Sequence, residues 1–183
     1  TPCESFWTDA QLRAGMCPSC GRAVSKETEE VWFFRQSRHR DALLRLIPEL
    51  VRPEGRAREM LNFLKDGLSD LAISRPKAKL PWGLPFPGDP DHVVYVWFDA
   101  LTNYLTGIGF PDPAFEKRWP AGLHVVGKDI LRFHAVTWPA MLLSAGLHLP
   151  KRIFAHGWVM APEGAKMSKS LGNVIDPEAL VKD

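Results

Sequence analysis

Three short apolar runs, separated by segments with helical patterns, constrain the fold of this chain more than any other feature. They are residues 93–97, 123–127 and 152–156. Apolar runs of this length are typical of strands that are buried on both faces, as in parallel sheets. Helices are predicted from Ala100 to Ile108, with Asp99 as the cap, and from Asp129 to Ala145. The alternation predicts an α/β fold with a partial doubly wound parallel sheet of the Rossmann type over residues 91–160.

The carboxyl ends of these predicted strands are where ligands bind in a sheet of this kind. The residues at the three ends are Trp97–Asp99, Gly127–Asp129 and His156–Val159. Each end also has a simpler interpretation. A lone Asp at the head of a helix, such as Asp129, is a good N-cap, and aromatic residues such as Trp97 commonly serve packing. The strand ends therefore define where a site is expected.

The segment of residues 31–90 precedes this sheet and is organised differently. Its predicted elements are a strand at 30–34, a helix from Arg38 to Ile47, a turn at 52–55, a helix from Arg56 to Lys65 and a strand at 71–75. Ser37 is the predicted cap of the first helix, and Pro48 is its predicted end. Residues 76–90 are rich in Pro and Gly, which predicts a rigid connector rather than a helix or a central strand.

All three cysteines, Cys3, Cys17 and Cys20, lie near the amino-terminal end. Two thiolates in a Cys-x-x-Cys turn can ligate one zinc ion, and structural zinc takes four ligands. A fourth ligand that formed such a pair with Cys3 would lie immediately before Thr1. A redox pair is the alternative, but no βαβ pattern surrounds these residues. Residues 1–30 are therefore predicted to be a small zinc-knuckle insert that depends on its metal for folding.

Residues 161–183 carry two lysines on a loop of small residues. Lys166 and Lys169 lie within Lys-Met-Ser-Lys-Ser, and glycines on both sides predict a mobile loop. Such a loop can close over a triphosphate and oppose the charge on a departing pyrophosphate, while serine hydroxyls and backbone N–H groups hold single oxygens. The alternative is a solvated basic loop. A helix is expected to begin after the loop.

Composition excludes several classes of protein. With 183 residues, 45% of them hydrophobic, the chain can bury a core and is not disordered. The 23 Lys and Arg against 21 Asp and Glu leave a net charge of +2, which is too small to indicate nucleic-acid binding by itself. No apolar run approaches the roughly 20 residues of a membrane span, so a soluble intracellular protein is expected. Because the chain begins with Thr1 and ends where a helix has barely begun, we expect a piece of a longer protein.

Five runs of residues occur together in a specific order. They are Leu71–Pro76, Tyr95–Tyr104, Gly127–His134, His156–Val159 and Lys166–Ser170. In this order and at these distances they resemble the methionyl-tRNA synthetase family of class I aminoacyl-tRNA synthetases. The similarity covers essentially the whole chain, with the single-zinc, bacterial or organellar type as the nearest form. On this resemblance, residues 1–90 are the zinc-bearing connective insert and its connector.

The resemblance implies an ATP-dependent ligase that activates L-methionine and transfers it to tRNA(Met). The implied methionine pocket comprises Trp97, Ala100, Leu101, Tyr104, Ile130 and His134. The implied ATP contacts are Gly127, Asp129, His156, Gly157, Trp158 and Val159, together with Lys166, Met167, Ser168, Lys169 and Ser170. The resemblance implies that Lys166 and Lys169 have the catalytic role, which is to stabilise the pyrophosphate. A structural zinc ion on the cysteines and Mg²⁺ bound with ATP are the implied cofactors.

The implied pocket makes physical sense for a thioether. Sulfur at the edge of an aromatic ring gains roughly 0.3 to 1.5 kcal/mol beyond simple burial. The resemblance implies that His134 hydrogen-bonds weakly to the sulfur, with help from Tyr104, and norleucine could not use such a partner. Without the resemblance, His134 would be interpreted as a satisfied histidine of the core.

Two features of the family do not occur in these residues: the His-x-Gly-His element that grips ATP, and the helical anticodon-binding domain. We therefore expect the isolated chain to be inactive. A class I synthetase for another apolar or thiol amino acid is one alternative. A zinc-ribbon nucleic-acid-binding module is the other, and the small net charge counts against it. The expected location is the cytoplasm, with an organellar matrix as the alternative, and the oligomeric state stays open.

Overall fold

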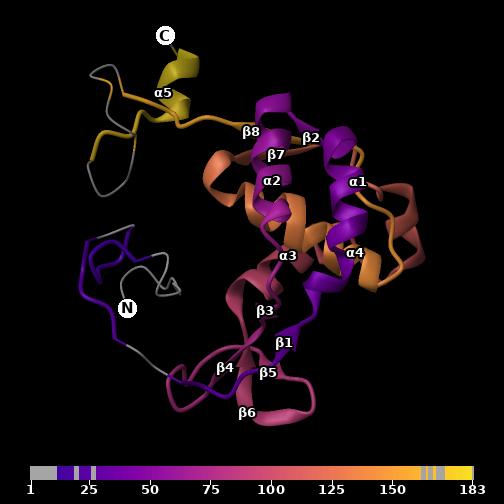
Figure 1. Cartoon of the computed structure of the whole chain (residues 1–183). Coiled ribbons are helices and arrows are strands. Elements are labelled where there is room, and N and C mark those ends of the chain that lie inside the picture. Colours follow the sequence, from indigo (N-terminus) through magenta and orange to yellow (C-terminus); the bar gives the residue numbers. More distant parts are fainter. Residues whose placement is uncertain are drawn as a thin grey trace. The chain divides into compact units, whose positions relative to one another are not determined.

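The computed structural model describes residues 12–18, 21–25, 28–161, 164, 167 and 172–182 (Figure 1). The chain divides into two compact units, Thr1–Glu30 and Val31–Asp183. In the first unit, Met16 forms isolated antiparallel bridges with Arg13 and with Ala23. The second unit contains both helices and sheets, and it confirms the predicted α/β class.

A three-stranded parallel sheet in the order β2-β8-β7 is the centre of the second unit. Its strands are β2 (Val51–Arg52), β7 (His124–Gly127) and β8 (Ile153–His156). β7 and β8 confirm the strands predicted at residues 123–127 and 152–156, and they pair so that Gly127 lies opposite His156. β2 lies partly where a turn was predicted, at residues 52–55. It ends before Pro53, which has no N–H for a ladder.

The apolar run at residues 93–97 does not belong to the parallel sheet, so that prediction is wrong. Its first two residues end β6 (Asp89–Val94), and α3 (Val96–Thr106) begins immediately afterwards. The first helical turn is closed by a hydrogen bond of 2.9 Å from the N–H of Phe98 to the carbonyl of Tyr95. Apolar character alone does not separate a strand from the first turn of a buried helix.

β6 belongs to an antiparallel sheet that the predicted connector at residues 76–90 did not anticipate. Its order is β4-β6-β5, with β4 (Ser74–Pro76) and β5 (Pro85–Phe86) on either side of β6. Gly88, at φ +78°, makes the turn between β5 and β6 in a conformation that favours glycine. Next to this sheet in the chain, β1 (Phe33–Phe34) pairs with β3 (Leu71–Ala72).

Helices α1 (Arg40–Leu50) and α2 (Glu54–Lys65) lie side by side, and α2 contacts β2 (Figure 1). Ser37 is not the cap of α1. It lies in a preceding 3-10 turn, where its N–H donates to Asp70 Oδ1 at 3.1 Å. Pro48 does not end α1 either. Proline removes one N–H from the helix, and burial of Leu50, which is 5% exposed, offsets that loss.

The helix predicted from Asp129 to Ala145 is present, but it is not regular. The helical segment 128–144 begins with a 3-10 turn (Lys128–Ile130), widens into a π-helical turn (Phe133–Thr137) and continues as α4 (Trp138–Ser144). Pro139 has no N–H to donate to the ladder, and the N–H of Trp138 donates to the carbonyl of Phe133, five residues back. Turns of this kind occur frequently at functional sites.

The remaining helices are short. A 3-10 helix covers Pro113–Lys117, and α5 (Pro177–Lys182) is the helix expected after the lysine loop. Asp99 lies in the first turn of α3 and is not its cap, because the helix begins at Val96, four residues earlier than predicted.

Two clusters of buried side chains hold the second unit together. One joins α1 and α2 to the inner face of the parallel sheet, and Leu64 is fully buried in it. The other joins α3 to α4 and is rich in aromatic rings, among them Trp119 and Trp138. Burial alternates along β7 and β8, so the outer face of the sheet carries Val125 and Phe154, which are 62% and 42% exposed.

Candidate active site

One face of α3 carries four of the predicted pocket residues. They are Trp97, Ala100, Leu101 and Tyr104. Because α3 begins at Val96, these positions have helical spacing and line a single stripe. Trp97 stacks on Phe133 of the helical segment 128–144, with ring centroids 4.2 Å apart and planes at 9°. The structure therefore brings α3 against the segment that carries the other two predicted pocket residues, Ile130 and His134.

A chain of hydrogen bonds connects these two elements. Tyr104 Oη lies 2.7 Å from His134 Nε2, and His134 Nδ1 lies 2.9 Å from the carbonyl oxygen of Ile130. A carbonyl oxygen only accepts, so Nδ1 carries the proton. Burial lowers the pKa of His134, which favours the neutral ring, and Nε2 then accepts from the Tyr104 hydroxyl.

Both ring nitrogens of His134 thus have partners within the chain. In this arrangement His134 has no N–H left for a substrate sulfur, and the atom that offers free lone pairs is the Tyr104 oxygen. Burial raises the pKa of Tyr104, so its hydroxyl also stays neutral. The implied hydrogen bond from His134 to sulfur would require Tyr104 to change its partner.

Two residues of this cluster were missed by the sequence analysis. Phe133 is the stacking partner of Trp97. His124, the first residue of β7, is only 6% exposed, and its Nε2 accepts a hydrogen bond of 3.4 Å from Trp138 Nε1. Burial, together with the neighbouring His134, lowers the pKa of His124 to about 4. The signal in the sequence was a single histidine inside an otherwise apolar strand.

The predicted nucleotide contacts lie at the ends of the parallel strands. Gly127 ends β7 and His156 ends β8, and the two are partners in the sheet. His156 Nδ1 donates to the carbonyl of Gly157 at 2.7 Å, and Lys128 Nζ lies 4.9 Å above the ring of Trp158. Two of the three predicted strand ends therefore meet at one edge of the sheet.

Asp129 lies close to the end of β7 with its side chain exposed. Asp129 is not the N-cap of the 3-10 turn Lys128–Ile130, because Gly127 occupies the N-cap position. A Cβ atom on Gly127 would lie 2.5 Å from Asp129 Oδ1, so only glycine leaves the carboxylate where it is. A cavity of about 210 Å³ opens here. Its lining residues are Glu59, Met60, Phe63, Lys128, Asp129 and Arg132.

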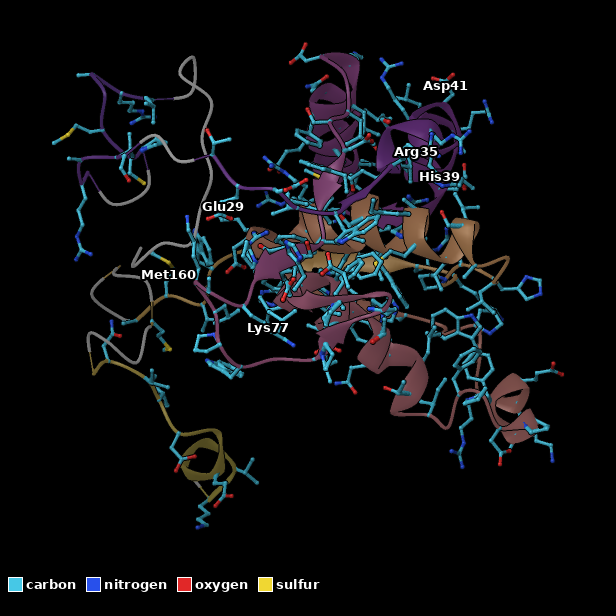
Figure 2. The ribbon with its side chains drawn as sticks, turned by 90° about the horizontal axis from the view of Figure 1, so that it is seen from below. Glu29, Arg35, His39, Asp41, Lys77 and Met160 are labelled. Atoms are coloured by element: carbon cyan, nitrogen blue, oxygen red, sulfur yellow. The ribbon has the colours of Figure 1, made fainter. Side chains whose placement is uncertain are left out.

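A larger and more open cavity of about 580 Å³ lies elsewhere, at the start of α1. Its lining includes Arg35 and His39, which Figure 2 labels, and none of the predicted site residues. Volume alone therefore does not locate the site in this chain. The candidate site is defined instead by the polar groups that converge at the strand ends and in the aromatic cluster.

The lysine loop is described only in part. The N–H of Met167 donates to the carbonyl of Val159 at 2.9 Å, which ties the loop to the residues after β8. Met160 lies on that connecting segment (Figure 2). The other predicted loop contacts lie outside the described residues: Lys166, Ser168, Lys169 and Ser170.

Of the three predicted zinc ligands, Cys3 and Cys20 also lie outside the described residues. Cys17 is buried, and its carbonyl accepts a hydrogen bond of 2.8 Å from the N–H of Gly21. Gly21 has φ +69°, as expected for the tight turn of a zinc knuckle. In the described part of the chain, no group of three or more His, Cys, Asp or Glu side chains could hold a metal ion. No helix there is long and apolar enough to cross a membrane.

The parallel sheet, the strand-end cluster and the lysine loop define a class I tRNA synthetase domain. The family model described as class I tRNA synthetases (M) matches residues 1–183. The chain belongs to this family.

Curated relatives that match this chain are named methionine–tRNA ligase. The protein of Caldanaerobacter subterraneus subsp. tengcongensis is 54% identical over 99% of this chain, and that of Thermotoga maritima is 51% identical over 99%. The chain spans 29% and 30% of their respective lengths. A crystal structure of Mycobacterium tuberculosis methionyl-tRNA synthetase bound by methionyl-adenylate matches with a TM-score of 0.82 and 49% identity, over 97% of this chain and 36% of that one.

The buried histidine of β7 gives a testable dependence of stability on pH. Because the pKa of His124 falls from 6.5 to about 4 on folding, the unfolded chain binds a proton there that the folded chain does not. The stability contributed by the neutral ring is therefore fully present above pH 6.5 and decreases as the pH falls toward 4. We expect His124→Phe to lose less unfolding free energy than the wild type between pH 7 and pH 5, measured by urea unfolding of the full-length protein.

His148 is the matched control, because it is an exposed histidine of the same unit. His148→Gln should follow the wild type at both pH values. An equal decrease in the wild type and in His124→Phe would contradict the assignment of His124 as a buried neutral ring.

Proposed function

We propose that this chain is the part of a methionine–tRNA ligase that holds the methionine side chain and one side of ATP. The observation that carries the proposal is the α3 stripe of pocket residues packed against Phe133 and His134, beside strand ends that converge on Asp129. The family membership and the similarity to a synthetase bound by methionyl-adenylate support it. tRNA(Met) is the proposed acceptor.

The proposed reaction has two steps. In the first, an oxygen of the methionine carboxylate attacks the α-phosphorus of ATP, and pyrophosphate leaves with the electron pair of the broken bond. In the second, a hydroxyl of the terminal ribose of tRNA attacks the carbonyl carbon of methionyl-adenylate, and AMP leaves. No side chain needs to form a covalent intermediate, so catalysis rests on positioning and electrostatics.

The methionine side chain is proposed to lie between α3 and the helical segment 128–144. The stacked rings of Trp97 and Phe133 supply an aromatic wall, and the neutral pair of Tyr104 and His134 supplies polarity without a charge. A neutral pocket suits an uncharged thioether, because a buried charge would favour charged or strongly polar side chains.

ATP is proposed to bind at the strand ends. Asp129 has an exposed carboxylate with no hydrogen bond to another described residue, so it is free to accept from ribose hydroxyls. His156, Gly157, Trp158 and Val159 are proposed to border the adenine. Lys166 and Lys169 are proposed to stabilise the pyrophosphate, with Met167, Ser168 and Ser170 beside the phosphates. Mg²⁺ is proposed to accompany ATP, held mostly by phosphate oxygens.

A structural zinc ion is proposed for the first unit. Cys3, Cys17 and Cys20 supply three thiolates, and the turn closed by Gly21 fits a Cys-x-x-Cys ligand pair. We further propose that the protein acts in the cytoplasm, with an organellar matrix as the alternative.

Amino-acid-dependent exchange between ATP and pyrophosphate tests the function directly. We expect the full-length protein to catalyse exchange with methionine, and the isolated 183-residue chain not to, because it lacks the His-x-Gly-His element. Exchange that depends on a different amino acid in the full-length protein would point to another class I synthetase. Robust turnover by the isolated chain would refute the expectation that it is inactive alone.

Removal of the Tyr104 hydroxyl tests the methionine pocket. Tyr104→Phe keeps the ring and leaves His134 Nε2 without its partner, so the imidazole that lines the proposed pocket loses an orienting hydrogen bond worth about 1 kcal/mol. We expect KM for methionine to rise about fivefold to tenfold and the preference over norleucine to fall, with KM for ATP unchanged. Thr106→Val, which removes an exposed hydroxyl from the same helix, is the control. An unchanged preference over norleucine would place the sulfur elsewhere.

An added methyl group at Gly127 tests the ATP side separately. Gly127→Ala forces its Cβ into the space of Asp129 Oδ1, so the carboxylate must move. We expect KM for ATP to rise at least tenfold and KM for methionine to change less than twofold in the exchange assay. Gly122→Ala is the control, since nothing lies within 4 Å of a Cβ there. Equal effects of the two variants would remove Asp129 from the nucleotide site.

A further inference from the structure

His124 is a buried polar residue to which the proposed function gives no role. It begins β7, where its backbone N–H donates to the carbonyl of Arg152 at 2.9 Å, so its Cα is fixed by the sheet. Its ring lies among aromatic side chains from three other elements. The centroid of the Tyr104 ring is 4.3 Å away, and that of Trp119 is 6.3 Å away.

The orientation of this ring is set by Trp138. The indole N–H of Trp138 is only a donor, so His124 Nε2 is the acceptor and a neutral His124 carries its proton on Nδ1. The titratable groups that face His124 are His134, from the π-helical turn, and Tyr104, from α3. His134 is buried and Tyr104 is half-buried, and both stay neutral, so no charge in this cluster draws a second proton onto the ring.

We infer that His124 is a positioning residue for methionine specificity, which acts by holding the ring of Tyr104 so that its hydroxyl meets His134. The contact runs from the sheet to the proposed pocket in two steps. β7 and Trp138 fix the imidazole, and the imidazole contacts the Tyr104 ring, with centroids 4.3 Å apart and planes tilted by 46°. Tyr104 is only partly buried, so without that support its ring can turn away from His134 Nε2. The inference rests on the proposed function, in which Tyr104 and His134 line the methionine pocket.

Two substitutions in the full-length protein test the contribution of the His124 ring separately from that of its hydrogen bond with Trp138. His124→Phe keeps a planar ring under Tyr104 and loses the acceptor for Trp138 Nε1. His124→Gln keeps an acceptor for that N–H and loses the ring. If support by the ring positions Tyr104, His124→Gln should raise KM for methionine at least fivefold and reduce the preference over norleucine. His124→Phe should keep both within about twofold of the wild type, even where its melting temperature is lower.

A purely structural role of His124 would give a different result. Both variants would lose stability, and neither would change methionine KM more than a control variant that loses the same amount of stability. Leu64→Ala is that control, because it opens the core between α1 and α2, away from the aromatic cluster. Equal KM values for His124→Gln, His124→Phe and Leu64→Ala would overturn the inference. KM for ATP should stay within twofold in all three.

Tyr104→Phe distinguishes a failure of this inference from a failure of the proposed function. If Tyr104→Phe alters methionine KM and His124→Gln does not, the pocket stands and His124 has no positioning role. If neither variant alters methionine KM, the proposed pocket is wrong, and the inference about His124 is wrong as well.

Discussion

The hydrogen bond between Tyr104 and His134 joins the two elements on which the candidate site depends. It links α3 to the helical segment 128–144 at 2.7 Å, and the stack of Trp97 on Phe133 joins the same elements at 4.2 Å. Both elements are also anchored in one buried cluster, where Leu101 and Trp138 are 1% exposed. The wall of the proposed pocket is therefore set by the packing of the protein before any ligand arrives, which reduces the ordering cost of binding.

The two residues joined by this hydrogen bond also leave the proposed pocket without a charge. Burial lowers the pKa of His134 and raises that of Tyr104, so each group is held in its uncharged form. In this uncharged pair both ring nitrogens of His134 have partners, and the Tyr104 oxygen keeps free lone pairs. The proposed nucleotide side is built differently, from strand ends, a glycine and an exposed carboxylate. One short stretch of chain, from β7 to the π-helical turn, thus contributes to both halves of the site.

Much of this arrangement follows from local sequence patterns. β7 and β8 were predicted because each is a short apolar run, and the predicted convergence of Gly127 with His156 follows from their parallel pairing. The resemblance of the Tyr95–Tyr104 run to a known family implied the pocket residues of α3, although the helix was predicted to begin at Ala100. Because α3 begins at Val96, Trp97 lies on the same face of the helix as the other predicted pocket residues of α3.

Other features have no local signal. β2 has only two residues, and it is a strand because Val51 and Arg52 pair with Ile153 and Phe154 about a hundred positions away in the sequence. The antiparallel sheet of β4, β5 and β6 is likewise made by pairing across a Pro- and Gly-rich segment. The role of His124 depends on which rings surround it, and periodicity does not reveal neighbours from other elements.

The outer face of β7 and β8 has a consequence for how this polypeptide behaves in solution. Val125 and Phe154 leave that face apolar and exposed, and among the described strands β7 pairs only with β8, so its other edge offers unpaired backbone groups. Parallel sheets are normally covered on both faces, and an open apolar edge is a template for association with other chains. Produced in isolation, the 183 residues should therefore self-associate through this face and edge.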